Sequence, residues 1–440
     1  VMPPVCRKSA HWGIPRNERD LQRARLTYEK LISFDTYAIA ARARLQLCTK
    51  AYVWYNQCMQ IIPVASGKGG VGKSLLSANL SIALGQAGKK TVLADLDLGA
   101  SNLHLAIGQH VDPAASLGAW LTDKGEFEDI IVPTDYENVS FIAGDSQIPG
   151  LTSLKPFQKT KLVRSFQSID ADYLILDLGA GTHQIILDMF LLSAQGIIVT
   201  APTVTATLNG YLFLKNAVFR LMYTTFKKGT AGYDRLEALR KDSTSLQRLY
   251  IPKLLETLDK ADPENTALFL SRMKSFRPRL IMNLIDDPKD ADKAQRIRRS
   301  CNQYLGLDIE YLGIMYRDSL QEKALESQLP IIVYKPQAVL SQAIYRIAEK
   351  VLASEAHSFD DAYAADTDGG ATFQTAEEEA NEDYDYKLSV IDDLVGSGTL
   401  TVGELAETIK TQQYELTQLK KENILLKSKL VQAAAQGFKV

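Results

Sequence analysis

Short apolar runs and longer amphipathic stretches alternate along the middle of the chain. The runs fall near residues 61–65, 91–94, 173–176, 196–201 and 279–283. Short apolar runs are typical of strands buried on both faces, whereas apolar residues recurring every three or four positions indicate helices. The alternation predicts an α/β fold, with a mostly parallel, doubly wound sheet and helices on both of its faces.

The first apolar run leads into a glycine-rich loop. Residues 67–74 fit the phosphate-binding pattern G-x-x-x-x-G-K-[ST], between an expected strand and an expected helix. Glycines let consecutive backbone N–H groups turn inward around phosphate oxygens. In such loops the lysine, here Lys73, reaches the β- and γ-phosphates, and the hydroxyl, here of Ser74, can ligate Mg²⁺. The residues expected to bind ATP are Gly67, Lys68, Gly69, Gly70, Val71, Gly72, Lys73 and Ser74.

Carboxylates end two of the other apolar runs. Asp95 and Asp97 come at the end of the second run, and Asp177 ends the third. Open α/β sheets bind ligands outside the carboxyl ends of their strands. We therefore expect these carboxylates near the phosphate loop, with Asp177 in the Walker B role of holding Mg²⁺ through a water molecule.

A second lysine in the loop, Lys68, indicates one family. Residues 68–74 match K-G-G-x-x-K-[ST], and this segment resembles the deviant phosphate loop of the MinD/ParA family. The resemblance implies that Lys68 reaches the nucleotide of a facing subunit, so that ATP joins two chains in a sandwich dimer. It further implies that Asp97 orients the attacking water and that Asp95 supports the metal shell. It assigns Asn283 to a hydrogen bond with the adenine edge.

The resemblance covers about residues 59–355. The stretches 98–103 and 177–181 look more like the MinD branch and the FlhG branch (flagellar number regulators) than like plasmid ParA, and residues 329–334 resemble the family's last strand. The implied function is a slow, partner-stimulated ATPase that positions or regulates cell-division or flagellar machinery. Two alternatives stay open: a ParA-like chromosome or plasmid partitioning ATPase, and an ATP-gated coiled-coil scaffold with little hydrolysis.

Leucines recur at roughly helical spacing between about residues 222 and 276. They predict a helical insertion within the nucleotide-binding domain. The insertion follows the helix expected at 211–222, which in relatives lies near the dimer face. We expect it to select a protein activator, with inert decoration as the alternative.

The segment before the first strand differs in composition from the rest. Residues 1–58 carry ten Lys/Arg against four Asp/Glu, and Met59 stands directly before the first apolar run. We interpret 1–58 as a mis-assigned start. The alternative is a basic arm that binds a partner or nucleic acid.

The last part of the chain divides into two segments. Between residues 355 and 393 there are thirteen Asp/Glu and one Lys, which predicts an acidic, disordered linker over 356–400. Residues 401–433 then carry a heptad pattern, which predicts a parallel coiled-coil dimer with a polar registry residue, Asn423, at an a position. The pattern places Ile409, Leu416, Asn423 and Leu430 at a, and Leu405, Gln412, Leu419 and Leu426 at d.

Overall composition narrows the remaining choices. The formal net charge is −2, so the residues after 58 sum to about −8 and lend no support to DNA binding. There is no apolar run long enough to span a membrane, and no closing basic amphipathic helix, so we do not expect direct membrane binding. The four cysteines form no CxxC pair, which disfavours a disulfide framework or a cysteine-ligated metal. We expect a cytoplasmic protein.

Overall fold

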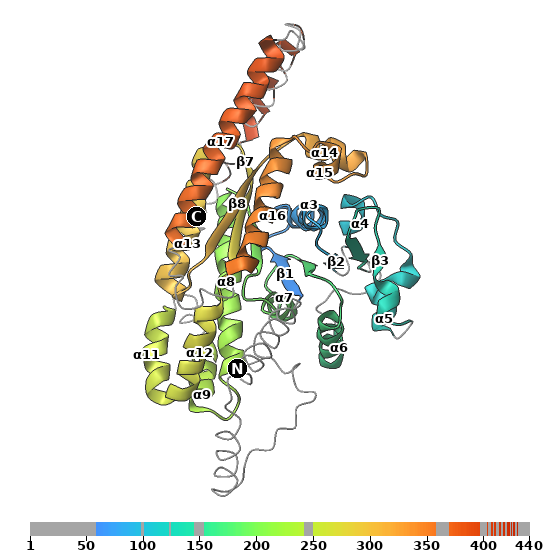
Figure 1. Ribbon diagram of the computed structural model, residues 1–440. Helices are drawn as coiled ribbons and strands as arrows, with labels where there is room; N and C mark the ends of the chain where they lie inside the picture. Colours follow the sequence, from blue (N-terminus) through green and yellow to red (C-terminus); the bar gives the residue numbers. More distant parts are fainter. Residues whose placement is uncertain are drawn as a thin grey trace, which may run out of the picture. The chain divides into compact units, whose positions relative to one another are not determined.

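A single mixed sheet forms the centre of the described part of the chain (Figure 1). The computed structural model describes residues 59–97, 101–122, 125–144, 154–241, 250–357 and 369–396, with individual helical residues between 403 and 429. The strands are β1 (Gln60–Ala65), β2 (Thr91–Leu96), β3 (Val132–Pro133), β4 (Val139–Ile142), β5 (Tyr173–Leu178), β6 (Ile197–Thr200), β7 (Arg279–Ile285) and β8 (Glu310–Tyr316). The larger helices are α3 (Lys73–Gln86), α6 (Pro156–Gln167), α7 (Gln184–Phe190), α8 (Val204–Thr225), α9 (Ala231–Lys241), α11 (Ile251–Ala261), α12 (Pro263–Ser275), α13 (Asp292–Ser300), α16 (Val339–His357) and α17 (Gly369–Gly396). Shorter helices are α4 (Leu103–Ala106), α5 (Leu117–Leu121), α14 (Leu320–Glu326) and α15 (Ile331–Tyr334).

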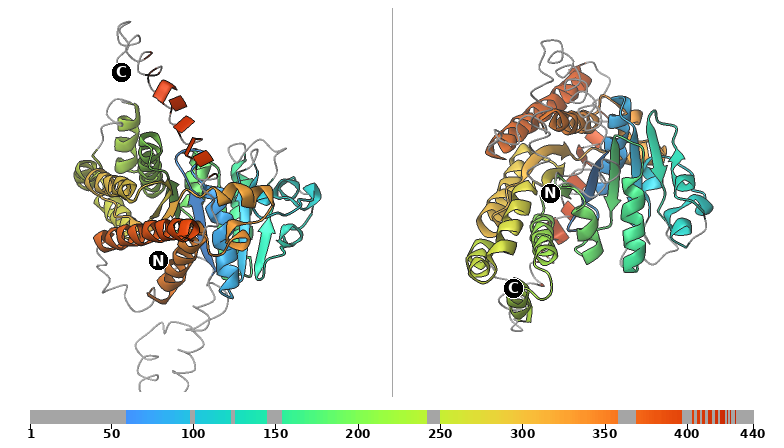
Figure 2. Two further views of the ribbon diagram at one scale, coloured as in Figure 1. Left: turned by 90° about the horizontal axis from the view of Figure 1, so that it is seen from above. Right: turned by 60° about the horizontal axis from the view of Figure 1, so that its bottom comes forward.

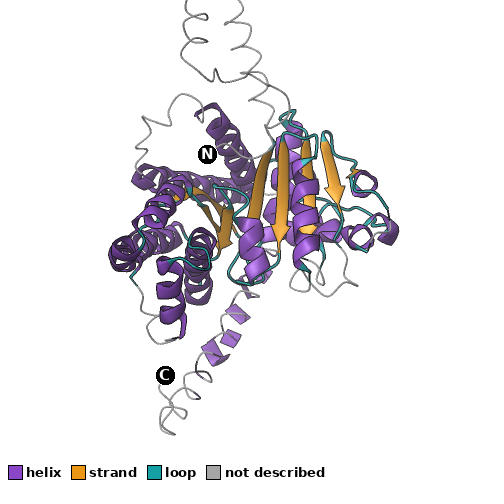
Figure 3. Cartoon of the chain, turned by 90° about the horizontal axis from the view of Figure 1, so that it is seen from below, coloured by secondary structure: helices purple, strands orange, loops and turns teal. Residues whose placement is uncertain are grey.

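The strand order is β3-β4-β2-β5-β1-β6-β7-β8, and every neighbouring pair is parallel except β3 with β4. In this order β2 lies on one side of β1, whereas β6 lies on the opposite side of β5, so the connections β1–α3–β2 and β5–α7–β6 run in opposite directions across the sheet. Because such crossovers are right-handed, α3 and α7 lie on opposite faces, and Figures 2 and 3 show helices on both faces of the sheet. The predicted doubly wound α/β fold is therefore confirmed, and its topological switch point lies between β1 and β5.

Burial explains why the central strands read as unbroken apolar runs. All residues of β2 and β5 are buried, because helices cover both faces of the sheet there. On one face, α3 and α16 pack together over the strands through residues such as Leu80, Leu84 and Ile344. On the other face, α7 and α8 meet through an edge-to-face pair of Phe190 and Phe213, with ring centroids 5.0 Å apart. This rigid centre fixes the loops at the carboxyl ends of the strands.

The prediction of a last strand at 329–334 is wrong. Ile331–Tyr334 form the helical turn α15, which begins after Pro330. The backbone N–H of Ile332 donates to Oδ1 of Asn79 on α3, so this short apolar run is buried against a helix. A four-residue apolar run cannot by itself distinguish a strand from a buried helical turn. The last strand, at the edge of the sheet beside β7, is instead β8, which the apolar pattern did not single out.

The expected helical insertion is mostly helical where it is described. Helices α9, α11 and α12 occupy it, apart from residues 242–249, which lie outside the described residues. The guanidinium of Arg272 on α12 donates to Thr224 and Thr225 at the end of α8, which joins the added helices to the core.

The prediction of a disordered linker over 356–400 is wrong for residues 369–396. These residues form α17, which packs on β8 through a stripe that includes Phe373, Ala376 and Ala380, all buried. Small alanines and acidic residues keep the mean hydropathy of the segment low, although its buried face is continuous. Residues 1–58 and most of the heptad segment 401–433 lie outside the described residues, so the mis-assigned start and the coiled coil stay predictions. Among the described residues, no helix is both long and apolar enough to cross a membrane.

Candidate nucleotide-binding site

The phosphate loop joins β1 to α3 at the switch point of the sheet. Gly70 and Gly72 have φ of 75° and 91°, in the left-handed region that favours glycine. A Cβ on Gly67 would lie 2.0 Å from the carbonyl oxygen of Asn209 on α8, so only glycine fits there. Lys73 is buried at the first turn of α3, directly after the loop. The predicted strand–loop–helix setting is confirmed, and the loop forms a cradle for an anion at a helix N-terminus.

Asp177 lies beneath this loop. It is the next-to-last residue of β5, and Asp95 is its partner in the pairing of β5 with β2. The Asp177 carboxylate is buried, and the hydroxyl of Ser77 donates to its Oδ1 at 3.1 Å. Burial raises the pKa of Asp177 to about 7, while the nearby charge of Lys73 opposes that rise. A buried carboxylate that is difficult to ionise alone suits a position where a cation would compensate its charge.

Asp95 organises the segment that follows β2. Its Oδ1 accepts a hydrogen bond from the backbone N–H of Asp97 at 3.0 Å. Its Oδ2 accepts from the hydroxyl of Ser101 at 2.7 Å and from the backbone N–H of Leu103 at 3.2 Å. Both carboxylate oxygens are therefore engaged with the chain itself. Sequence reasoning missed this role, and the expected support of a metal shell stays a prediction.

Asp97 faces the glycine segment after Asp177. A Cβ on Gly179 would lie 2.8 Å from Asp97 Oδ1, so the side chain occupies the space that this glycine leaves. Asp97 is half-buried, and burial raises its pKa, with the charge of Lys73 acting in the opposite direction. The structure thus brings the three predicted carboxylates to the ends of two adjacent strands.

Asn283 supports the phosphate loop from below. Its Nδ2 donates to the carbonyl of Val71 at 2.9 Å, and its Oδ1 accepts from the backbone N–H of Leu284 at 2.7 Å. A Cβ on Gly72 would lie 2.1 Å from the same Nδ2, so the glycine admits this contact. The amide is buried and committed to backbone groups. The adenine contact expected of Asn283 stays a prediction, whereas its hold on the loop is a contact that the sequence did not reveal.

Lys68 lies at the surface of the loop. Its Nζ donates to the hydroxyl of Thr205 at 3.3 Å, at the start of α8. The contact with the nucleotide of a facing subunit expected of Lys68 stays a prediction. Ser66 steadies the bend, because its hydroxyl donates to the carbonyl of Lys68 at 2.7 Å.

The residues present fit a Mg²⁺-bound nucleoside triphosphate. The glycine cradle, the buried Lys73 and the buried carboxylate of Asp177 supply the phosphate-binding and metal-supporting groups, and Ser74 adds a hydroxyl. Among the described residues, no group of three or more His, Cys, Asp or Glu side chains is placed to hold a metal ion by itself.

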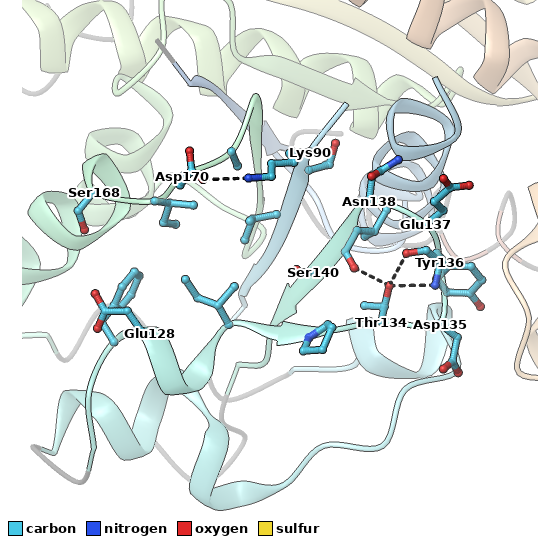
Figure 4. A pocket seen from close by; sticks show the side chains of 18 residues that line it. Lys90, Glu128, Thr134, Asp135, Tyr136, Glu137, Asn138, Ser140, Ser168 and Asp170 are labelled. Carbon is cyan, nitrogen blue, oxygen red and sulfur yellow. Dashed lines mark hydrogen bonds and ion pairs between the residues drawn. The ribbon is translucent and has the colours of Figure 1, made fainter. Parts of the chain in front are cut away.

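One cavity among the described residues is not part of this site. It has a volume of about 770 Å³ and lies at the amino ends of β2, β4 and β5, at the opposite edge of the sheet (Figure 4). An exposed ion pair between Lys90 and Asp170, 2.9 Å apart, crosses it. The candidate nucleotide-binding groups all lie at the carboxyl ends of the strands.

The raised pKa of Asp177 predicts a pH dependence of stability. In an unfolded chain the carboxyl ionises near its ordinary value of 3.8, but in the nucleotide-free native state it ionises only near 7. The native state therefore holds the extra proton between these values, and this contribution to stability is lost as the pH rises through 7. We expect the free energy of unfolding of the wild type, relative to Asp177→Asn, to fall by about 2–3 kcal/mol between about pH 5 and about pH 8. Urea denaturation of both proteins in EDTA measures this difference, and a pH-independent difference contradicts it.

Comparison with known proteins decides the family. The model of the CobQ/CobB/MinD/ParA nucleotide-binding domain matches residues 62–331, which is more than half of the chain. The chain belongs to this family. The match begins in β1, includes the phosphate loop and both carboxylate-bearing strands, and ends at the first residue of α15. The resemblance expected from the loop is thus confirmed, and the protein is a MinD/ParA-type family member with a nucleotide-binding domain.

Individual relatives share only a low sequence identity with this chain. The antiactivator FleN of Pseudomonas aeruginosa is 22% identical over 296 residues, which cover 67% of this chain and 86% of FleN. The flagellum site-determining protein YlxH of Helicobacter pylori is 30% identical over 205 residues, covering 43% of this chain and 67% of YlxH. A solved structure of the septum site-determining protein MinD with Mg-ADP from Pyrococcus horikoshii is 22% identical, covers 68% of this chain and 98% of that one, and has a TM-score of 0.46.

Proposed function

We propose that this family member is a Mg²⁺-dependent ATPase that acts as a switch by closing into an ATP-bound sandwich dimer. The observation that carries the proposal is the combination of a two-lysine phosphate loop with Asp97 packed against Gly179. Phosphoryl transfer depends mainly on positioning and on charge neutralisation, which these groups can supply.

Each polar group has a distinct part in the proposed reaction. Lys73 and the loop N–H groups would hold the β- and γ-phosphates, while Ser74 directly and Asp177 through a water would hold Mg²⁺, which would neutralise charge on the phosphates. Asp97 orients the attacking water and accepts its proton, and burial raises the pKa of Asp97, which makes its carboxylate a stronger proton acceptor. Asp95 positions Asp97 through the hydrogen bond to its backbone N–H.

The proposed dimer face lies around Lys68 and the first turns of α8. Val204 is 82% exposed, and Leu208 and Leu212 follow it at four-residue intervals, also exposed. These three side chains form an apolar stripe beside Thr205, the residue that Lys68 contacts. An exposed apolar stripe beside a phosphate site supports a surface that a second copy covers.

The names of relatives support a role in placing cell machinery. FleN is an antiactivator, YlxH determines the flagellum site, and MinD proteins determine the septum site. We propose that this protein regulates flagellar or cell-division machinery, with a protein activator of its ATPase. A solved complex of MinC with MinD from Aquifex aeolicus shows that a MinD protein binds a protein partner. A partitioning ATPase would instead require ATP-dependent DNA binding that weakens steeply with salt.

Substitution of Lys68 tests the sandwich. Lys68→Ala is expected to keep ATP binding, because Lys73 and the loop backbone remain, but to lose the dimer-dependent part of hydrolysis. Steady-state ATPase rates over a range of protein concentrations measure this loss of hydrolysis. For the wild type, the rate per chain should rise as protein concentration, or closure of the dimer by ATP, increases. Lys253→Ala, an exposed lysine on α11, is the matched control. If Lys68→Ala kept both the wild-type turnover and the compaction that ATP causes on closing the dimer, the protein would be a nucleotide hydrolase that works as a single chain.

A further inference from the structure

Helix α17 follows the residues matched by the family model, and its first half is fixed to β8. The ring of Phe373 lies 4.6 Å from that of Tyr311, measured between centroids. Further along, the hydroxyl of Tyr316 donates to the carbonyl of Ala380 at 2.8 Å. Lys350 on α16 pairs with Glu379 at 2.7 Å, and Arg346 pairs with Asp383. Aromatic, hydrogen-bonded and ionic contacts therefore set the direction of α17.

That direction is parallel to β8. The start of the helix meets the start of the strand, because Thr372 accepts from the backbone N–H of Tyr311. The later residues Ala380 and Lys387 meet the end of the strand at Tyr316, whose ring centroid lies 5.7 Å from Lys387 Nζ. All strands except β3 run in the same direction, so their carboxyl ends lie together on one side of the domain. The far end of α17 extends from this side, which we call the carboxyl edge of the sheet (Figure 1). The phosphate loop and Lys68 belong to this same edge.

Residues 386–390, here called the distal arm, include the last contact with β8, made by Lys387, and continue beyond it. Tyr386, Leu388 and Val390 are 48%, 44% and 38% exposed. Val390 also continues the three-and-four spacing of the docking stripe, which runs through Phe373, Ala376, Ala380, Asp383 and Lys387. Val390 therefore extends the docked side of α17 beyond the last contact with β8, while Tyr386 and Leu388 expose apolar surface on other sides of the helix.

We propose that the distal arm packs against a second copy of this chain in the ATP-closed dimer. This inference rests on the proposed sandwich, which would bring the second copy to the edge from which the arm projects. The heptad segment 401–433, which is itself predicted to pair with a second copy, follows the arm in the sequence. Three half-exposed side chains bury far less than the roughly 1,200 Å² of a stable interface. The arm therefore adds to a dimer closed by ATP and does not hold one alone.

Photo-crosslinking in the full chain tests this contact. Val390 is replaced by p-benzoylphenylalanine in a chain carrying Asp97→Ala, which should retain ATP, and heavy and light isotope-labelled copies are mixed before irradiation. We expect mixed-isotope adducts with Mg-ATP, mapping to residues 59–357 of the second copy, and loss of those adducts with Mg-ADP. The same label at Asn381, an exposed residue on the docked half of the helix, is expected to give none.

The outcomes separate the two proposals. If sedimentation and Lys68 dependence show ATP-driven closure but position 390 gives no adduct to the second copy's residues 59–357, the arm proposal is overturned and the sandwich stands. Adducts of equal yield with ATP and ADP, or adducts only within 397–440, also overturn it. If ATP causes no closure at all, the sandwich fails, and the arm proposal fails with it. Far-ultraviolet circular dichroism of each labelled chain verifies that α17 is retained.

Discussion

Replacement of Asp97 by asparagine is expected to slow ATP hydrolysis by about 10²–10⁴-fold, the range for loss of a positioned proton acceptor. Asparagine keeps the shape that fits against Gly179 but cannot take a proton from the attacking water. ATP affinity should be unchanged or higher, because one negative charge near Lys73 and the phosphates is removed. Single-turnover hydrolysis together with equilibrium binding of a fluorescent ATP analogue separates these two effects.

A matched control is Asp259→Asn, which makes the same change at an exposed position on α11. It should leave both rate and affinity unaltered. If Asp97→Asn lost affinity and rate in equal measure, Asp97 would be part of nucleotide binding and its assignment as the water-orienting group would be wrong. If neither changed, another group would have to position the water.

The arrangement of the candidate nucleotide site could be predicted where its residues are close together in the sequence. The loop at 67–74 is contiguous, and Asp177 ends an apolar run, so pattern and spacing were sufficient. The contacts that hold these groups in place join distant segments. Ser77 donates to Asp177 across a hundred positions, and Asn283 reaches Val71 from β7. No periodicity in a single sequence encodes such pairs.

Two elements were missed for a physical reason that they share. In β8, Gly313 interrupts the apolar run, yet a Cβ there would lie 2.8 Å from Ile347, so the glycine admits close packing of α16. In α17, the acidic surface dominates the composition, while the buried face uses small alanines that contribute little hydropathy. In both, residues with little or no side chain lie where a neighbouring element packs closely. Composition averaged over a segment cannot detect this kind of packing.

Phe373→Ala is the second change with a large expected effect. The side chain is buried between α17 and β8, where its ring lies on Tyr311 and the Arg298 guanidinium lies 5.3 Å from its centroid. Truncating a buried phenylalanine typically costs about 3–5 kcal/mol. We therefore expect the free energy of unfolding to fall by about that amount, as measured by urea denaturation of the full chain. A disordered linker at this position would give no change.

Phe157→Ala supplies the matched control, because Phe157 is an exposed phenylalanine at the start of α6 and should alter stability by less than about 0.5 kcal/mol. The distinction matters for the switch, since α17 can transmit closure to the C-terminal segment only if it is held rigidly on the sheet. Equal, small effects of the two substitutions would mean that α17 is not docked in solution. Position 390 would then have no fixed relation to the nucleotide edge, and closure of the ATP site would not reach the heptad segment through this helix.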